Sequence, residues 1–327
     1  MAADTNIEYL TKSWNPIQTI IKGESGQGYH CTHVDEGCRN CWAEGMNNRV
    51  GNRLPFDTKV FEYEIKNSEL AKPLSWRKPQ MIGVQFMGDL FHKDIPFELI
   101  FKVFMVMQRA ENHTFLILTK RPERMYEFFS FPMNHIDPKW VNLTLNNTKV
   151  GEMFSNCKNI WYGTSISDQQ SADTRIPKLL KLKGRFPMVK IWLSIEPMIK
   201  AIELQPVWFG NYKSCDGILP RQIDWVVCGG ESGPHARPLH PDWVRSLRNQ
   251  CKEANVSFFF KQWGEWVPEP DIHKGRTLWF DGSMDTGIAS ENGIGRNVRR
   301  VGKKKAGRLL DGVEHNEFPE GVGNVTK

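Results

Sequence analysis

Three cysteines lie close together near the start of the chain, in the stretch CTHVDEGCRNCW at residues 31–42. Cys31, Cys38 and Cys41 have the spacing C-x6-C-x2-C, and closely spaced thiolates are typical ligands of zinc or of iron–sulfur clusters. The chain has seven cysteines in all, an odd number without regular spacing elsewhere, which is unlike a disulfide framework. The cysteines therefore predict metal or redox chemistry in a reducing compartment.

Zinc and an iron–sulfur cluster make different demands on these cysteines. Structural zinc usually takes two close pairs of ligands, of which Cys38 and Cys41 form one. Cys31 with His30 or His33 could complete a Cys3His site, although no second close pair of cysteines follows. A cubane cluster is usually held by four cysteines, so three would leave one iron open to a cofactor or substrate. The sequence favours the open cluster and keeps zinc as the alternative.

Six apolar segments further along the chain have the composition of strands that are buried on both faces. They span residues 81–89, 114–120, 159–165, 189–197, 223–231 and 256–262, and helical patterns occur between them at 97–110, 122–129, 172–182 and 240–254. Such alternation predicts βαβ units and a parallel sheet. We expect an α/β fold with a partial or complete parallel (β/α) TIM-like barrel, a first strand within 13–20, and insertions at 132–158 and 203–221.

Polar residues stand at the carboxyl end of every one of these segments. They are Asp89, Lys120, Ser165 with Ser167, Glu196, Glu231, and Lys261 with Gln262. Because the carboxyl ends of barrel strands form the active-site face, we expect these side chains to converge on one mouth. The cysteines would lie on the same face, since they follow the first strand. For Glu231 and Lys261, a salt bridge between adjacent strand ends is an equally good interpretation.

Length and composition predict a folded protein. The chain has 327 residues, of which 40% are hydrophobic and 24% charged. No basic start followed by an apolar run and no apolar stretch of about 18 residues occurs, so we expect a cytoplasmic protein. We divide the chain into a barrel domain at 1–266 and a basic C-terminal extension at 267–327.

The net charge of +6 is concentrated in RNVRRVGKKKAGR at 296–308, which contains no acidic residue. A basic stretch of this kind is a candidate for contacts with nucleic-acid phosphates, and a solvated surface run is the alternative. The candidate nucleic-acid-binding residues are Arg299, Arg300, Lys303, Lys304 and Lys305.

Several longer stretches resemble an uncharacterised radical-SAM-like family carried by phages and mobile elements, which is distantly similar to spore photoproduct lyase. They are SWNP (13–16), GCRNCWAE (37–44), FMGDLFH (86–92), LTKRPERM (118–125), SIEPM (194–198), GGESGPHARPLHPDWVRSLRNQC (229–251), FFFKQWGEW (258–266) and VGKKKAGRLLDG (301–312). The resemblance covers about residues 11–318 and implies, for a phage-encoded protein, a location in the host cytoplasm. The cysteine spacing departs from the C-x3-C-x2-C of most radical SAM enzymes, which is why zinc stays open.

The resemblance implies a [4Fe-4S] cluster on Cys31, Cys38 and Cys41 whose open iron binds S-adenosylmethionine (SAM). Reduction by an electron donor would then release a 5′-deoxyadenosyl radical, with the cofactors carrying the chemistry. By matching motif, the implied cofactor-binding residues are Trp42, Gly88, Asp89, Lys120, Ser165, Ser167 and Glu196. The implied catalytic residues are Lys120, Glu196 and Glu231.

The expected substrate is a nucleobase or nucleotide, in DNA or free. Our most specific hypothesis is radical isomerisation of an amino-acid-modified thymine during phage DNA hypermodification, and a DNA base-lesion repair lyase comes second. A zinc-stabilised nucleic-acid-binding protein without catalysis is the third. It predicts that the cysteines serve folding and that affinity falls steeply with salt through residues 296–308.

Overall fold

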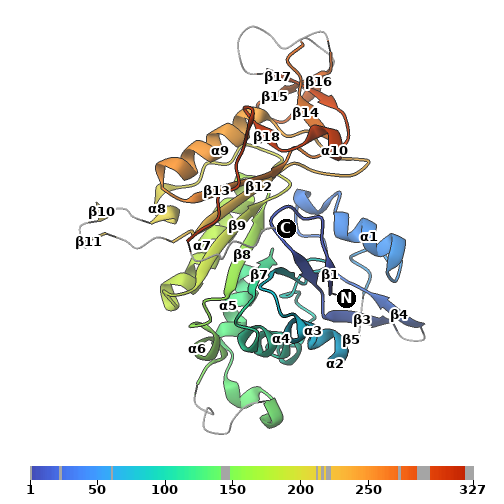
Figure 1. The fold of residues 1–327 in the computed structure, drawn as a ribbon, viewed down its shortest axis with the longest axis vertical. Helices are drawn as coiled ribbons and strands as arrows, with labels where there is room; N and C mark the ends of the chain where they lie inside the picture. Colours follow the sequence, from blue (N-terminus) through green and yellow to red (C-terminus); the bar gives the residue numbers. More distant parts are fainter. Residues whose placement is uncertain are drawn as a thin grey trace.

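The centre of the computed structural model is an eight-stranded sheet (Figure 1). The structure describes residues 2–21, 24–59, 62–140, 148–210, 213–214, 217–218, 222–271, 274–285 and 295–320. The strands, in spatial order, are β1 (Ala2–Asp4), β2 (Lys12–Trp14), β6 (Met81–Val84), β7 (Thr114–Thr119), β8 (Ile160–Ile166), β9 (Lys190–Ile195), β12 (Trp225–Gly229) and β13 (Ser257–Gln262). From β2 onward all neighbours are parallel, whereas β1 is antiparallel to β2.

The seven parallel strands curl into a half-barrel and follow one another in chain order. No ladder joins β13 back to β1 or β2 within the described residues, so the sheet there is open. All six predicted apolar segments are strands of this sheet, which confirms the α/β parallel architecture. A TIM-like identity stays a prediction.

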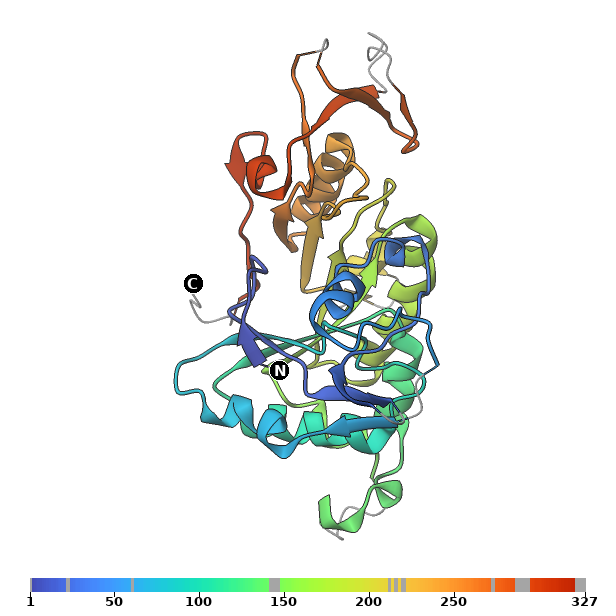
Figure 2. The same ribbon diagram turned by 90° about the vertical axis from the view of Figure 1, so that its right-hand side faces the viewer.

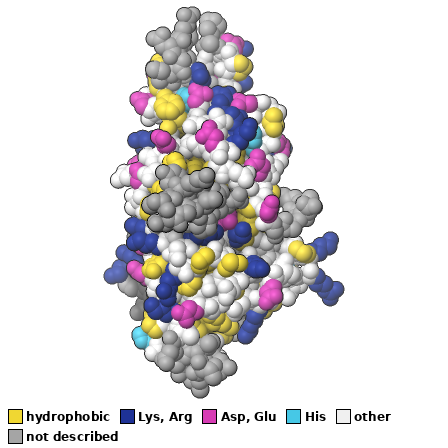
Figure 3. All heavy atoms as spheres, turned by 90° about the vertical axis from the view of Figure 1, so that its left-hand side faces the viewer, with side chains coloured by type: hydrophobic (Ala, Val, Ile, Leu, Met, Phe, Trp, Pro, Cys, Tyr) yellow, Lys and Arg dark blue, Asp and Glu magenta, His cyan; other side chains and the backbone are white. Residues whose placement is uncertain are grey.

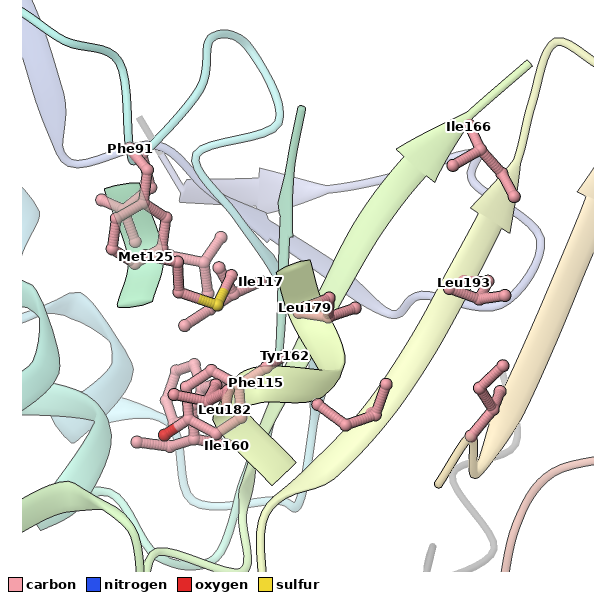
Figure 4. Close-up of a cluster of buried hydrophobic side chains, with 14 of the residues drawn as sticks. Phe91, Phe115, Ile117, Met125, Ile160, Tyr162, Ile166, Leu179, Leu182 and Leu193 are labelled. Atoms are coloured by element: carbon pink, nitrogen blue, oxygen red, sulfur yellow. The ribbon is translucent and has the colours of Figure 1, made fainter. Parts of the chain in front are cut away.

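Four long helices cover the outer face of the sheet, close to the predicted positions. They are α4 (Phe97–Arg109), α5 (Pro122–Ser130), α7 (Gln169–Arg185) and α9 (Pro241–Glu253). Strand residues two apart, such as Phe115 and Ile117, point outward against Met125 of α5 and Leu179 of α7 (Figure 4). Because these side chains are fully or almost fully buried, they form the main core of the molecule.

The inner face of the sheet is filled by a second apolar cluster. Its buried members are Tyr9, Leu10, Met81, Leu116, Trp161, Trp192, Trp225, Val227 and Phe259. The Tyr9 ring lies 5.5 Å from that of Trp225 and 5.8 Å from that of Phe259, both edge-on. The N-terminal segment with Tyr9 and Leu10 therefore fills the inside of the half-barrel, and the tryptophans of the sheet strands pack against it.

The predicted first strand consists of two strands in different sheets. β2 ends at Trp14 in the main sheet, and β3 (Ile17–Ile21) pairs with β4 (Glu24–Gly28) and β5 (Glu62–Ile65) in a separate antiparallel sheet. Pro16 stands between them and lacks the N–H that a ladder needs. The next elements are η1 (Glu36–Cys38), α1 (Trp42–Val50), α2 (Asn67–Leu70) and α3 (Lys72–Ser75).

Both predicted insertions carry only short elements. The first contains η2 (Met133–His135), η3 (Pro138–Trp140) and α6 (Val150–Phe154), and the second contains α8 (Pro206–Phe209), β10 (Lys213–Ser214) and β11 (Gly217–Ile218). The remainder of the two insertions lies partly outside the described residues.

The C-terminal extension contains a small sheet of its own, which stands at one end of the molecule in Figure 2. The order is β14 (Trp266–Pro268), β17 (Gly295–Arg300), β15 (Arg276–Trp279) and β16 (Met284–Asp285), followed by α10 (Lys303–Ala306), β18 (Leu309–Leu310) and β19 (Val313–Glu314). Leu278 and Val298 are buried in this extension, and Leu310 joins the main core. Among the helices of the described residues, none has the length and apolar content to cross a bilayer.

Candidate functional site

The three cysteines share one loop, residues 31–41, which we call the cysteine loop. Cys31 opens it, Cys38 ends the short helix η1, and Cys41 is the residue before α1. All three thiols are free and half-buried. Contacts described below join this loop to residues that follow β7, β8 and β12, so these three strand ends meet at the cysteines. Convergence of all six strand ends on one mouth stays a prediction.

Two cations directly after β7 lie beside two of the sulfur atoms. Lys120 Nζ is 3.2 Å from Cys38 Sγ, and Arg121 Nη1 is 4.0 Å from Cys31 Sγ. Arg121 also donates through Nη2 to the hydroxyl of Thr32 at 2.6 Å. Positive charge at this range stabilises thiolates and the anionic clusters that they hold. The structure therefore places Lys120 next to Cys38, and the cofactor contact that the resemblance implies for Lys120 stays a prediction.

Asp89, which follows the turn after β6, is fully engaged by the chain. Its carboxylate accepts hydrogen bonds from the Thr119 hydroxyl at 2.6 Å, Arg121 Nη1 at 2.7 Å and the Lys120 amide at 3.1 Å, and its side chain is only 5% exposed. Asp89 therefore orients Arg121 toward Cys31. The contact with SAM that the resemblance implies for Asp89 stays a prediction.

Asp35 in the cysteine loop forms a second anchor, which sequence analysis missed. It accepts from Lys120 Nζ at 2.6 Å and from Arg175 of α7, whose other nitrogen Nη1 donates to the Ser165 carbonyl at 2.8 Å. Burial alone would raise the pKa of Asp35, but Lys120 and Arg175 outweigh it and lower that pKa. The loop is thus tied to β7 and α7, and Ser165 contributes its backbone carbonyl to this network.

Local sequence explains why Arg175 reaches this point. Asp168 caps α7 in a capping box, accepting from the Ser171 amide at 2.8 Å, which fixes where the helix begins. Ser167 precedes the cap and lies against the loop, because a Cβ on Gly37 would stand 2.9 Å from the Ser167 hydroxyl. Ser167 therefore packs on the cysteine loop.

Glu231 after β12 holds the loop from another side. Its Oε2 accepts from Asn40 at 3.0 Å, and Arg237 donates to it through Nε at 2.9 Å and to Oε1 through Nη2 at 2.6 Å. Burial would raise the pKa of Glu231, but the bonds from Arg237 and Asn40 dominate and lower it below the usual 4.5. Glu231 therefore helps to hold the cysteine loop in place through Asn40.

This lowered pKa gives a pH dependence. A carboxyl whose pKa is lower folded than unfolded stabilises the fold above the unfolded pKa, and that stability is lost as pH falls. We expect Glu231→Gln to lower the free energy of unfolding by about 1.5–3 kcal/mol at pH 7. The deficit relative to wild type should shrink as pH falls below about 4.5, because the carboxyl of the unfolded wild-type chain then becomes protonated, and it should vanish once the pH is below the lowered pKa of the folded carboxyl.

Urea unfolding at pH 7 and pH 4 measures this difference. Exposed Glu203 supplies the control, since its replacement by glutamine should give no pH-dependent change. A Glu231→Gln deficit that is equal at both pH values would contradict the assignment.

Lys261 pairs with Glu196, so the suggested salt bridge between Glu231 and Lys261 is wrong. Lys261 Nζ donates to Glu196 Oε1, and Gln262 Nε2 lies 3.4 Å from the same oxygen. β9 and β13 both flank β12, and their side chains meet across it inside the mouth. No hydrogen bond or ion pair joins Glu196 or Lys261 to the cysteine loop in the described part of the chain.

Gly88 and Trp42 have clear placements. A Cβ on Gly88 would lie 2.8 Å from the His30 carbonyl oxygen, so glycine is needed for the chain before Cys31 to approach the β6 turn. Trp42 begins α1 and is 49% exposed, which excludes a core role for its indole. Both residues border the cysteine loop, where the resemblance expects cofactor contacts.

Gly88→Ala is expected to destabilise the protein by about 1–3 kcal/mol, because the new methyl group would collide with backbone. Gly45→Ala in α1 is the matched control, since nothing lies within 4 Å of its Cβ. It should raise stability by about 0.5–1 kcal/mol through helix propensity. Thermal or urea unfolding compares the two, and equal effects would disprove the close-approach role of Gly88.

Of the two histidines that could complete a Cys3His zinc site, His33 is the more fully engaged by side chains of the protein. Both ring nitrogens of His33 are engaged, by Asp57 and by Glu44 at 3.0 Å, and His30 Nδ1 lies 3.0 Å from the Tyr63 hydroxyl. No group of three His, Cys, Asp or Glu side chains among the described residues could ligate a single metal ion. A cubane holds each thiolate on a different iron, so its ligands need not meet around one ion.

The raised pKa of Cys31 is compatible with ligation of either zinc or a cluster. Burial raises the pKa of the Cys31 thiol to about 12, and the Asp89 carboxylate adds to this effect. A thiolate there needs a bound cation, and a coordinating metal deprotonates thiols outright. Cys31 is therefore suited to metal ligation and unsuited to act as a free nucleophile.

Most of the basic C-terminal stretch is paired within the chain. Arg299 binds Glu269, Arg300 Nη2 donates to the Pro234 carbonyl at 2.7 Å, and Lys303 lies 3.3 Å from Glu8. Lys304 and Lys305 lie exposed on α10. Cationic and anionic side chains are also interspersed on the face in Figure 3. Nucleic-acid binding by these residues stays a prediction.

Comparisons with solved structures find spore photoproduct lyase complexed with dinucleoside spore photoproduct, at 10% identity and a TM-score of 0.38. A mutant of that lyase with bound AdoMet and dinucleoside spore photoproduct matches at 10% identity and a TM-score of 0.36. Each alignment covers 92% of this chain and 71% of the other. No curated protein matches the chain. A family model described as "Protein of unknown function (DUF5131)" matches residues 4–319, nearly the whole chain, which therefore belongs to this family.

Proposed function

We propose that the protein is a radical SAM enzyme that acts on a nucleobase or nucleotide. The observation that carries the proposal is the cysteine loop itself, with three free thiols over the strand ends and Lys120 and Arg121 beside two of the sulfurs. Cys31, Cys38 and Cys41 would hold a [4Fe-4S] cluster, leaving one iron for SAM. With an external electron donor, these cofactors supply a 5′-deoxyadenosyl radical for hydrogen-atom abstraction.

The chain's own residues would position the loop from three sides. Asp89 orients Arg121 toward Cys31, and Asp35 orients Lys120 toward Cys38. Glu231 fixes Asn40 from the β12 side. A site held by such mutually bonded charges is preorganised, which a cofactor site requires. Lys120 and Glu231 therefore support the loop in this proposal and act on the substrate only through it.

Glu196 is the catalytic candidate that we assign to the substrate. It lies in the mouth, bonded to Lys261 and Gln262. Lys261 fixes the carboxylate, and the Lys261 ammonium also lies 6.0 Å from the centre of the Tyr9 ring. A carboxylate fixed in this way can accept a hydrogen bond from a substrate hydroxyl or amide. Trp42, exposed beside Cys41, is suited to stack on a base or on the adenine of SAM.

Two reactions are compatible with this site. The first is isomerisation of an amino-acid-modified thymine during phage DNA hypermodification, in which the abstracted hydrogen returns and the mass of the base is unchanged. The second is cleavage of a base lesion by a repair lyase, which restores ordinary bases. Mass spectrometry of treated DNA distinguishes them. A cluster of this kind also suits the reducing cytoplasm, where we place the protein.

Metal analysis of protein purified without oxygen tests the proposal. We expect about four irons per chain with matching sulfide, followed by reductive cleavage of SAM to 5′-deoxyadenosine. One zinc per chain without sulfide would disprove the radical proposal and leave the zinc-stabilised, non-catalytic nucleic-acid-binding protein.

A further inference from the structure

A cleft with a volume of about 370 Å³ opens beside the cysteine loop, lined by Arg39, Asn40, His235 and Arg237. Arg39 and Asn40 belong to the loop and lie between Cys38 and Cys41. The other two residues belong to the segment that follows β12. This volume lies in the range of small-molecule sites, and the lining is polar and rich in arginine. A ligand held here would therefore lie next to the proposed cluster.

A carboxylate of the chain already lies between the two arginines. Glu36 Oε2 is 3.8 Å from Arg39 Nη1 and 3.5 Å from Arg237 Nη1. Both contacts are long, and the Glu36 and Arg39 side chains are 65% and 70% exposed. Solvated pairs of this kind contribute little free energy. Both guanidinium groups can therefore contact an anion at the position of the Glu36 carboxylate. An anion of higher charge, such as phosphate, can displace that carboxylate.

The two arginines differ in how firmly they are held. Arg237 is fixed by its bonds to Glu231, and Arg300 holds the segment before it through the Gly233 and Pro234 carbonyls. Arg39 has Glu36 as its one recorded ion-pair partner in the described part of the chain. One rigid and one adjustable guanidinium form a clamp, and the planar fork of arginine matches phosphate oxygens.

We infer that this cleft binds a phosphate group of the nucleotide substrate, with Arg39 and Arg237 as its ligands. The inference rests on the proposed function and deepens it, since it assigns a phosphate-bearing substrate to the same site. It also adds a phosphate contact at the cysteine loop, whereas Arg299, Arg300 and Lys303 of the basic stretch at 296–308 have partners within the chain.

Calorimetric titration of the full-length protein, purified without oxygen, tests this assignment. The probes are thymidine 5′-monophosphate, thymidine without phosphate, and a short oligothymidylate. Arg39→Gln should weaken binding of thymidine monophosphate about tenfold or more, as expected for loss of a charge-assisted pair. Binding of thymidine should stay unchanged. Lys181→Gln removes the same charge from an exposed residue of α7 that does not line the cleft, and serves as the control.

Glu36→Gln is a second variant, for which we expect the opposite effect on phosphate affinity. It removes the competing carboxylate, so phosphate should bind more tightly than to wild type. A merely structural role of these residues would not give opposite effects. If only the oligothymidylate depends on Arg39, the phosphate belongs to a DNA strand; if the monophosphate does too, a single nucleotide suffices.

The assignment is overturned if wild type binds neither phosphate probe, or if Arg39→Gln changes neither of them. It is overturned as well if thymidine loses as much affinity as its monophosphate, or if Lys304→Gln and not Arg39→Gln weakens binding. These outcomes are separate from the metal analysis. A zinc-containing protein that binds phosphate through Arg39 would refute the radical proposal and keep the cleft. A cluster-containing protein that binds phosphate independently of Arg39 would keep the radical proposal and refute the assignment of the cleft.

Discussion

Replacing Cys38 with alanine is expected to leave a folded protein that has lost essentially all of its cluster iron and sulfide. Cys38 supplies one of three thiols and lies 3.2 Å from Lys120 Nζ. A cubane with one open iron needs three protein thiolates on its other irons, and this variant keeps only two. Because the Cys38 side chain is only half-buried, the free energy of unfolding should change by less than about 1 kcal/mol. Iron and sulfide analysis, together with urea unfolding, measures both quantities.

Cys157→Ala supplies the matched control, since this half-buried thiol lies after α6 and outside the cysteine loop. It should keep full iron content. The zinc-stabilised alternative predicts a different result for Cys38→Ala, namely loss of folding, because structural zinc sites contribute folding energy directly. A variant that unfolds would therefore count against the cluster, and one that keeps its iron would remove Cys38 from the ligand set.

The sheet was predictable from sequence because its strands are buried on both faces. Continuous apolar runs then identify strands directly, and 114–120, 159–165 and 256–262 end within one residue of β7, β8 and β13. The run at 81–89 extends past β6, which ends at Val84. Gln85 has a φ of +57° and exchanges hydrogen bonds with the Ile17 backbone, so its side chain replaces a strand partner. Nothing in the apolar pattern indicates this turn.

The site was predictable only where residue type and local spacing carry the signal. Cys31, Cys38 and Cys41 satisfy that condition, and Lys120 follows from its place at a strand end. Their partners depend on contacts far apart in the chain: Asp35 meets Lys120 across 85 positions and Arg175 across 140. Such pairs depend on how the strands curl and how α7 is set against them. A single sequence contains no local pattern that specifies them.

The outcome for Lys261 shows why strand neighbours alone mislead. β12 lies between β9 and β13, and Glu231 stands beyond the end of β12, where the chain has turned toward the cysteine loop. Glu196 directly follows β9 and faces Lys261 across the intervening strand. In parallel barrels alternate strands supply the same layer of inward side chains. Lys261 therefore pairs with Glu196 because both belong to the same layer of inward side chains, although their strands are not adjacent.

Asp89→Ala is expected to lower the free energy of unfolding by about 3–5 kcal/mol, the usual cost of leaving a buried charge without its partner. Asp89 is 5% exposed and Arg121 13%, so neither water nor another carboxylate replaces the lost pair. Urea unfolding measures the effect. Asp94→Ala is the control, since this carboxylate is 44% exposed and lies 3.7 Å from His92, and its loss should cost less than about 1 kcal/mol.

A double-mutant cycle between Asp89→Ala and Arg121→Gln separates the pair from other contacts. If Asp89 acts chiefly by holding Arg121, the double variant should be markedly more stable than the sum of the single losses predicts. Additive losses would mean that the Thr119 hydroxyl and the Lys120 amide are the partners that matter. Cluster iron should fall in both single variants, because Arg121 then no longer lies fixed beside Cys31. Full iron content with additive losses would remove this ion pair from the proposed cofactor site.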